Sequence, residues 1–337
     1  MNDRVDVLVV GGGQAGLAAS YRLSRAGASH IVVDASARIG DSWRRRYDSL
    51  TLFTPRTLSA LPGLSLLGEP EGYAGRDEFA DYLENYAETF SLPVLTGTRV
   101  ERLFRRSDGA VEAGLAGGGV IVCRSVVDCT GAFQRPWVPR MADQFGDDVL
   151  QLTSGTYSNP ADVPPGTVLV VGDGASGRDI AVDLAATHRV LLATGKPRRL
   201  FPERFLGQST WTWMDRLGLL SATSNSAIGR IMKAADPFPD RGRSLKALRA
   251  MGIDVWPRLE HAGGRRVQFA NRTTKDVDAV IWAVGYRDDD GWLGADGSGV
   301  HRLGRPWLRN RASGLVLGAA RDSETVIDRV LAELGQP

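Results

Sequence analysis

Cysteine and histidine are scarce in this sequence, with two and four among 337 residues. Cys123 and Cys129 stand in apolar, strand-like sequence, at a spacing that fits neither a zinc site nor a C-x-x-C redox pair. We expect two buried thiols in a reducing compartment. The four histidines are His30, His188, His261 and His301. They are too scattered along the chain to predict a catalytic triad or a metal site.

Long apolar runs and an excess of one charge are also missing. The 41 basic and 39 acidic residues leave a net charge of +2, which gives no indication of a nucleic-acid surface. The first apolar run ends in glycine after a few residues, too early for a signal-peptide core or a transmembrane helix. We therefore expect a cytoplasmic protein without a transmembrane segment. With 43% hydrophobic residues, the chain has the composition of about two globular domains.

Glycine is abundant, and three glycines follow the first apolar run. Val5 to Val10 has the composition of a buried parallel strand, and the segment after the glycines has helical apolar spacing up to Gly27. The three fall at G-x-G-x-x-G spacing and are Gly11, Gly13 and Gly16. Strand, turn and helix in this order predict a dinucleotide cradle, in which the glycines allow a tight turn, close approach of a pyrophosphate and helix packing.

An acidic residue completes the first cradle. The predicted strand His30 to Val33 ends at Asp34, 23 positions after Gly11. A carboxylate in this place accepts hydrogen bonds from the hydroxyls of an adenosine ribose. The alternative is a glycine-rich loop without a ligand.

The same pattern returns 161 residues downstream. Thr167 to Val171 repeats the strand, and Arg178 to Ala186 is expected to be helical. The motif between them supplies a second set of predicted nucleotide-binding residues, Gly172, Gly174, Ser176 and Gly177.

The second cradle differs after its second strand, Val190 to Ala193. No acid follows, and a basic cluster stands there instead, made of Lys196, Arg198 and Arg199. Such a cluster attracts the 2′-phosphate of NADP, although a solvated loop is the alternative. Two different dinucleotides side by side are explained most simply by hydride transfer, with a flavin in the first cradle and NADPH in the second.

Further segments resemble the flavin-containing monooxygenase family of two-dinucleotide-binding flavoproteins. They are ARIGDSWRRRYDSLTLFTP from Ala37, VVDCTGAFQRPWVP from Val126 and VIWAVGYR from Val280. The resemblance implies an α/β fold with two Rossmann-like domains, FAD and NADPH as cofactors, and flavin contacts at Gly40, Trp43, Thr130, Gly131 and Gly304.

After each glycine motif, one later strand ends near a glycine, and these two strands predict where the chain crosses between domains. Ser125 to Cys129 and Asp278 to Ala283 are buried strands that end where the chain must leave a sheet. We expect an FAD domain of residues 1–159 and 283–337, and an inserted NADPH domain of residues 160–282. Residues 201–251 form a helical insertion within the latter. Its apolar residues are expected to be helix core or a substrate-pocket wall, and they are Phe205, Trp211, Trp213, Met214 and Leu220.

Two departures from the family pattern weaken the monooxygenase assignment. Thr153 stands where the family fingerprint has histidine, although Tyr157 keeps the aromatic position four residues later. Only Arg287 to His301 separates the second crossing from the terminal segment that begins RLGRPWLRNR, and relatives have a longer stretch there. The final helix is expected over Ser323 to Leu334.

The resemblance also implies a reaction. In the family, NADPH reduces FAD, and O2 adds to the flavin to give a C4a-peroxide that transfers one oxygen to a small organic substrate. Asp48 is the carboxylate expected to face the reaction centre, unless it pairs with Arg44 or Arg45. The alternatives are an NADPH-dependent reductase or oxidase without oxygen insertion, and a regulatory protein that only binds nucleotides. A homodimer is left open.

Overall fold

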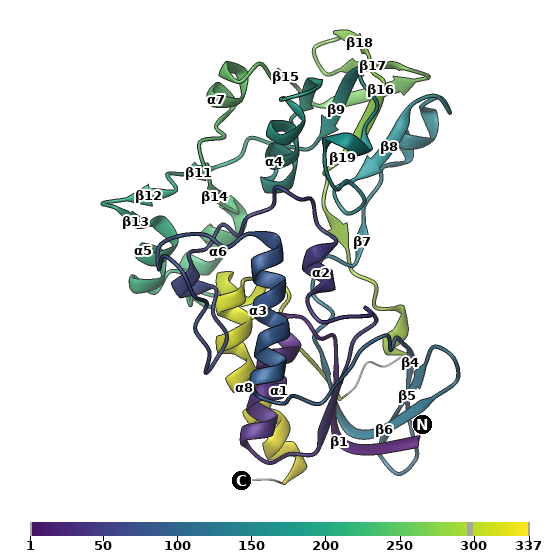
Figure 1. The fold of residues 1–337 in the computed structure, drawn as a ribbon, viewed down its shortest axis with the longest axis vertical. Helices are drawn as coiled ribbons and strands as arrows, with labels where there is room; N and C mark the ends of the chain where they lie inside the picture. Colours follow the sequence, from purple (N-terminus) through teal and green to yellow (C-terminus); the bar gives the residue numbers. More distant parts are fainter. Residues whose placement is uncertain (1, 295–298, 336–337) are drawn as a thin grey trace.

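Two large β-sheets, joined by a pair of chain crossings, organise the protein in the computed structural model (Figure 1). The structure describes residues 2–294 and 299–335. The first sheet lies beside the chain termini, and the second occupies the opposite end of the long axis (Figure 1). The expected α/β class with two Rossmann-like units is confirmed.

The first sheet has a parallel centre and an antiparallel flank. Its order is β3-β2-β1-β6-β5-β4, and β21 extends β6 in parallel beyond the end of β5. The strands are β1 (Asn2–Val10), β2 (His30–Val33), β3 (Val94–Leu95), β4 (Val100–Arg105), β5 (Val111–Leu115), β6 (Val120–Asp128) and β21 (Val300–Arg302). The carboxyl ends of β1, β2 and β6 therefore meet at one edge, where ligands bind in such sheets.

Three helices cover one side of this sheet and lie side by side in Figure 1. They are α1 (Gln14–Arg25), α3 (Arg76–Thr89) and α8 (Val316–Leu334). Helix α8 begins at Val316, so the expected start at Ser323 is wrong by two turns. The apolar stretch before Ser323 continues the helical spacing, and its side chains are buried in three clusters, formed with α1 and the first sheet, with α1 and α3, and with residues of the 201–251 insertion.

The second sheet is parallel throughout. Its order is β15-β10-β9-β19-β8, with β15 (Asp254–Trp256), β10 (Arg189–Ala193), β9 (Thr167–Val171), β19 (Ala279–Trp282) and β8 (Leu150–Thr153). Helices α4 (Ala175–Leu184) and α7 (Leu245–Ala250) pack on one face. The other face packs against a small antiparallel sheet of β16 (Leu259–Gly263), β17 (Arg266–Phe269) and β18 (Thr274–Asp276).

Strand β8 bears on the expected domain boundary. The sequence division grouped its residues with the first unit, whereas β8 pairs with β19 in the second sheet. This pairing is long-range in sequence, and no local pattern around Leu150 announces it. The division of the chain into an FAD domain and an NADPH domain remains a proposal, with β8 moved to the second unit.

The two crossings run side by side. Strand β7 (Arg135–Pro136) pairs antiparallel with β20 (Tyr286–Arg287) between the sheets (Figure 1). The Trp137 amide also donates to the Gly285 carbonyl at 2.9 Å. The crossings thus form a two-stranded connection instead of two independent linkers.

The insertion after β10 extends back to the first unit. It contains the short strands β11 (Leu200–Phe201), β12 (Arg204–Phe205), β13 (Gln208–Ser209) and β14 (Phe238–Pro239), with helices α5 (Thr210–Arg216) and α6 (Ala227–Ala235). Trp211, Met214 and Leu220 are buried against Leu58 and Leu315 of the first unit. Short 3-10 turns complete the described fold at Arg56–Leu58, Arg140–Gln144, Pro160–Asp162, Gly291–Leu293 and Arg311–Gly314.

The close packing of α4 on its own turn predicts a stability effect. A methyl group on Gly177 would overlap the Gly172 carbonyl oxygen, so we expect Gly177→Ala to lower the free energy of unfolding by about 2–4 kcal/mol. Gly263→Ala is the control, because its methyl group would meet no atom within 4 Å. Urea unfolding of both variants measures the difference, and equal stabilities would contradict the packing argument.

Candidate functional site

The first glycine motif forms a turn that only glycine fits. Gly11 has φ +106°, and a Cβ there would lie 2.5 Å from the Cys129 carbonyl oxygen. A Cβ on Gly16 would overlap the carbonyl oxygen of Gly11, so this glycine brings α1 onto the turn. Gly13 caps α1 with an ordinary φ of −80° and open space around its Cβ position. The fold itself therefore leaves room for a side chain at this position.

The second motif repeats this geometry. Gly172 has φ +105°, and its Cβ would lie 2.5 Å from the Ala283 carbonyl oxygen. A Cβ on Gly177 would overlap the Gly172 carbonyl, and Gly174 caps α4 with φ −70°. Each cradle is thus closed by the residue that follows its own crossing strand. The two glycine motifs that repeat in the sequence thus have the same backbone geometry in the structure.

The two cradles place their acids in opposite positions. In the first, Asp34 at the end of β2 accepts hydrogen bonds from the amides of Gly12 and Ser36, each at 2.7 Å. In the second, Asp173 stands inside the glycine loop and accepts from the Gly195 amide after β10 at 3.2 Å. Both cradles therefore have a hydrogen bond between the glycine loop and the residues after the second strand. The carboxylate that accepts it stands at the strand end in the first cradle and in the loop in the second.

Asp173 is neutralised within the protein. It is buried and forms an ion pair with the buried Arg178 at 3.1 Å. Arg198 lies further off, with its Nε 3.9 Å from Asp173. Lys196, Arg198 and Arg199 are all exposed at the end of β10, so their charge is available to a ligand.

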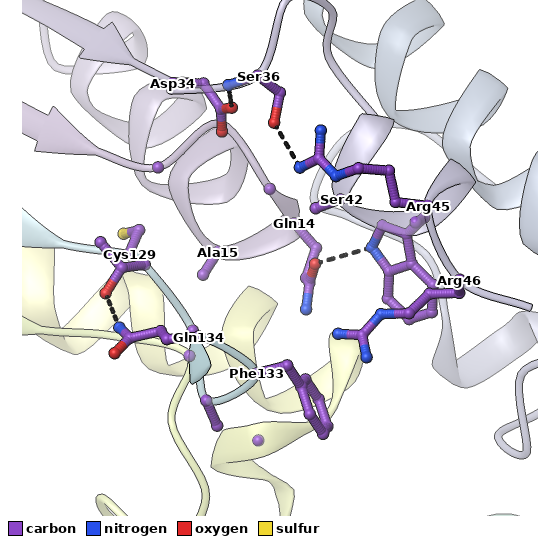
Figure 2. Close-up of a pocket in the computed structure, with 18 of the residues that line it drawn as sticks. Gln14, Ala15, Asp34, Ser36, Ser42, Arg45, Arg46, Cys129, Phe133 and Gln134 are labelled. Carbon is purple, nitrogen blue, oxygen red and sulfur yellow. Dashed lines mark hydrogen bonds between the residues drawn. The ribbon is translucent and has the colours of Figure 1, made fainter. Parts of the chain in front are cut away.

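A cavity of about 500 Å³ opens at the edge of the first sheet, where β1, β2 and β6 end. This volume is typical of ligand sites. The N-terminus of α1 borders it, and Figure 2 shows side chains from the first cradle, the segment after α2 (Asp41–Arg44) and the first crossing around it. The cavity continues to Ala175 and Ser176 at the N-terminus of α4. One space therefore reaches both helix N-termini.

The predicted site residues divide into two groups. Those that line the cavity are Gly11, Gly13, Asp34, Trp43, Thr130, Gly131, Ser176 and Gly304. Those that do not are Gly16, Gly40, Gly172, Gly174, Gly177, Lys196, Arg198 and Arg199. Gly16 and Gly177 pack helices, and Gly40 has φ +85° against the Ala80 carbonyl, so these glycines support the site from behind.

Asp48 does not lie where the sequence analysis expected. It is not among the residues that line the cavity, and its side chain is half exposed. Its carboxylate pairs with Arg76 at 2.6 Å and accepts from Asn159 Nδ2 at 2.9 Å. The expectation of a catalytic Asp48 is therefore corrected, and so is its alternative, because the ion-pair partner is Arg76 and not Arg44 or Arg45.

The insertion forms no wall of the cavity. None of its five apolar residues named above is among the lining residues. Trp211 instead packs against Phe53, which does line the cavity, with ring centroids 5.7 Å apart. The insertion thus supports the cavity wall from outside.

Three arginines line the cavity together with Asp34, Asp179 and Asp289. Arg45, Arg46 and Arg99 line it, and none has an ion-pair partner within residues 2–294 and 299–335. Arg45 donates to Ser36 Oγ at 2.9 Å, whereas Arg46 points the other way, toward Phe133 (Figure 2). Trp43 Nε1 donates to Gln14 Oε1 at 3.2 Å. Together with the α1 N-terminus, these cations suit a pyrophosphate-containing ligand.

The two cysteines are poorly suited to redox exchange. Both are free and buried, and burial raises the pKa of Cys123 to about 12 and the pKa of Cys129 well above its ordinary value. A thiolate is needed for disulfide chemistry, so neither thiol is suited to it.

Sequence reasoning missed several cavity residues. They include Gln14, Arg99, Phe133, Gln134, Asp179 and Trp292. Phe133 and Gln134 directly follow the Thr130-Gly131 crossing, so proximity to that motif was an available signal. Trp292 and Arg99 come from loops brought in by long-range packing, and no local signal marks them.

The fold and cavity define an oxidoreductase with two dinucleotide cradles facing one space. The family model described as pyridine nucleotide-disulphide oxidoreductase matches residues 8–203. The chain is 40% identical to an uncharacterized CzcO-like oxidoreductase of Geobacillus kaustophilus, over 98% of this chain and 99% of that protein.

Two further relatives are monooxygenases. A probable indole-3-pyruvate monooxygenase of Arabidopsis thaliana, YUCCA9, is 26% identical over 85% of this chain and 76% of its own. The solved flavin-containing monooxygenase of Stenotrophomonas maltophilia is 27% identical, with a TM-score of 0.81 over 98% of this chain and 99% of that one. The chain belongs to the pyridine nucleotide-disulphide oxidoreductase family, and the expected resemblance to flavin-containing monooxygenases is confirmed.

The glycine that precedes α1 leads to a prediction about flavin binding. Because Gly13 has room for a methyl group in the fold, Gly13→Ala should fold normally but bind flavin at least about tenfold more weakly, since the backbone must approach the pyrophosphate there. The flavin absorbance of the purified variant and titration of its apoprotein with FAD measure this.

Gly174→Ala is the matched control in the second cradle, where the nearest atom to the added methyl group is 4.0 Å away. It should retain full flavin content. Equal flavin loss in both variants would contradict the assignment of the first cradle to the flavin.

Proposed function

We propose that the protein is a flavoprotein monooxygenase that uses NADPH and O2 to insert one oxygen atom into a small organic substrate. The observation that supports this best is the single cavity bordered by the N-termini of α1 and α4. A hydride donor held at the second cradle and a flavin held at the first would share that space. Hydride transfer needs such direct proximity.

The residues of the first cradle fit FAD. Gly13 leaves open space before the α1 N-terminus, and Arg45 and Arg99 add positive charge near Asp34. Asp34 would accept from the adenosine ribose, because within the described part of the chain each of its oxygens accepts from one backbone amide and retains a lone pair. When bound, the flavin supplies the electron transfer and oxygen activation that protein side chains lack.

NADPH would occupy the second cradle. Gly174 leaves room at the α4 N-terminus, and the exposed cluster of Lys196, Arg198 and Arg199 would bind the 2′-phosphate. The internal pairing of Asp173 with Arg178 removes the negative charge that would repel that phosphate. The protein's contribution to catalysis is then to hold the two nucleotides and the substrate in one cavity and to limit water there.

Oxygen insertion is distinguished from electron transfer alone by the balance of products. Under air, the flavin-loaded protein should oxidise NADPH, and a productive substrate should lower the hydrogen peroxide released per NADPH and acquire label from isotopic O2. Indole-3-pyruvate, for which the plant relatives are named, is a suitable first substrate. NADPH oxidation that always ends in stoichiometric peroxide, across acids, sulfides and amines, would instead identify a reductase or oxidase.

The basic cluster predicts a coenzyme preference. Replacing Arg198 and Arg199 with alanine should raise KM for NADPH about tenfold and leave KM for NADH unchanged, because only NADPH carries the 2′-phosphate. Steady-state kinetics with both coenzymes tests this.

Arg189→Ala is the control, since this exposed arginine lies at the opposite end of β10 and pairs with Asp254. It should leave both KM values unchanged. A parallel rise for NADH and NADPH in the double variant would contradict recognition of the 2′-phosphate.

A further inference from the structure

Arg46 is a cation in the cavity that forms no ion pair with an acid of the described residues. It is half-buried, and no carboxylate of the described ranges 2–294 and 299–335 lies within ion-pair distance of it. The nearby acids have their own partners: Asp48 pairs with Arg76, Asp289 with Arg135, and Asp179 with Arg241 and Arg243. The positive charge of Arg46 is therefore left for a ligand.

Aromatic rings and one hydroxyl fix the position of Arg46. Its guanidinium carbon lies 4.6 Å from the ring centroid of Phe133 and 5.4 Å from that of Tyr286. Its Nη1 donates to the Tyr286 hydroxyl at 3.0 Å, and Ser154 Oγ donates to the same hydroxyl at 3.3 Å. Arg76 Nη1 holds the Arg46 carbonyl at 2.6 Å. A guanidinium held in this way is ordered before any ligand arrives.

Most of the hydrogen-bonding capacity of Arg46 remains available. A guanidinium has five N–H donors, and the described contacts use one of them. Two parallel donors on one edge suit a carboxylate. Beside them Phe133 has 62% of its surface exposed, and its ring meets that of Tyr286 edge to face at 5.2 Å. A charged edge next to an open aromatic surface suits a planar or aromatic acid.

Arg46 differs in position from the other arginines of the cavity. Arg45 contacts Ser36 and Arg99 follows Thr98, whose amide donates to the Asp34 carbonyl, so both lie at the ribose end of the first cradle. Arg46 lies at the crossings, beside β20 and the residue after β8. Arg46 therefore lies at a place where the two units meet.

We propose that Arg46, with Phe133 beside it, binds the carboxylate of an aromatic or other planar acid and thereby selects anionic substrates. This inference names the substrate class and rests on the proposed function only for calling the ligand a substrate. The alternative source of the anion is a phosphate of a bound nucleotide, and the experiment below distinguishes the two.

The test compares two ligands of nearly equal shape, phenylacetate and phenylacetamide. Their dissociation constants are measured by calorimetry on the flavin-loaded protein without NADPH, so no turnover is involved. The wild type should bind the acid at least about tenfold more tightly than the amide, as expected for a charge-assisted hydrogen-bonded pair. Arg46→Met should abolish this preference, because it should weaken the binding of the acid and leave the binding of the amide unchanged.

Two further variants complete the test. Arg46→Lys should keep part of the preference, because it retains the charge without the planar fork. Phe133→Ala should weaken the binding of both ligands to the same extent. Flavin content and the thermal midpoint verify that each variant is folded and loaded.

Three results would overturn the proposal. The first is equal binding of the acid and the amide by the wild type, and the second is an unchanged preference for the acid in Arg46→Met. The third is displacement of phenylacetate by inorganic pyrophosphate together with a higher KM for NADPH in Arg46→Met. This third result would mean that Arg46 binds a nucleotide phosphate. Because binding is measured without turnover, a protein that keeps the acid preference but inserts no oxygen would contradict the proposed function and leave this inference standing.

Discussion

The approach of a helix to the carbonyl of its own turn is the constraint on which both nucleotide sites depend. Gly16 faces Gly11, and Gly177 faces Gly172, so closely that no side chain fits between them. This contact aims each helix N-terminus at the carboxyl edge of its sheet, and it puts the peptide groups of the next helical residues against the cavity. The turn glycines also touch the residue after a crossing strand, so each cradle fixes the start of the chain's path to the other unit.

The local parts of this design could be predicted from sequence, because glycine spacing and apolar periodicity are local signals. The strand His30–Val33 was predicted to the residue, and both cradles have the expected turn geometry. Features that depend on distant segments were not predicted. Strand β8 joins the second sheet through β19, and Asp48 turns to Arg76, a residue on the separate helix α3. A motif places a backbone, whereas the partners of a charged side chain depend on what else packs nearby.

The crossings connect cofactor geometry to ligand recognition. Strands β7 and β20 pair with each other, so neither can move without the other. Tyr286 belongs to β20, and its hydroxyl accepts from Arg46 of the first unit and from Ser154 beside the second sheet. The position of the free cation is therefore fixed by both units at once. A change in their relative orientation would change the donor geometry that a bound anion meets.

The acids of the two cradles stand at different places on nearly the same backbone arrangement. In both cradles a backbone hydrogen bond joins the glycine loop to the strand end, and a second hydrogen bond beside it has an aspartate carboxylate as its acceptor. When Asp34 supplies this carboxylate from the strand end, its charge stays beside the proposed ribose site and has no ion pair in the described part of the chain. When Asp173 supplies it from the loop, Arg178 neutralises the charge, and the strand end is free to carry cations. The same backbone arrangement thus carries a carboxylate at one strand end and a basic cluster at the other, and under the proposed function this difference in charge would separate a ribose hydroxyl from a 2′-phosphate.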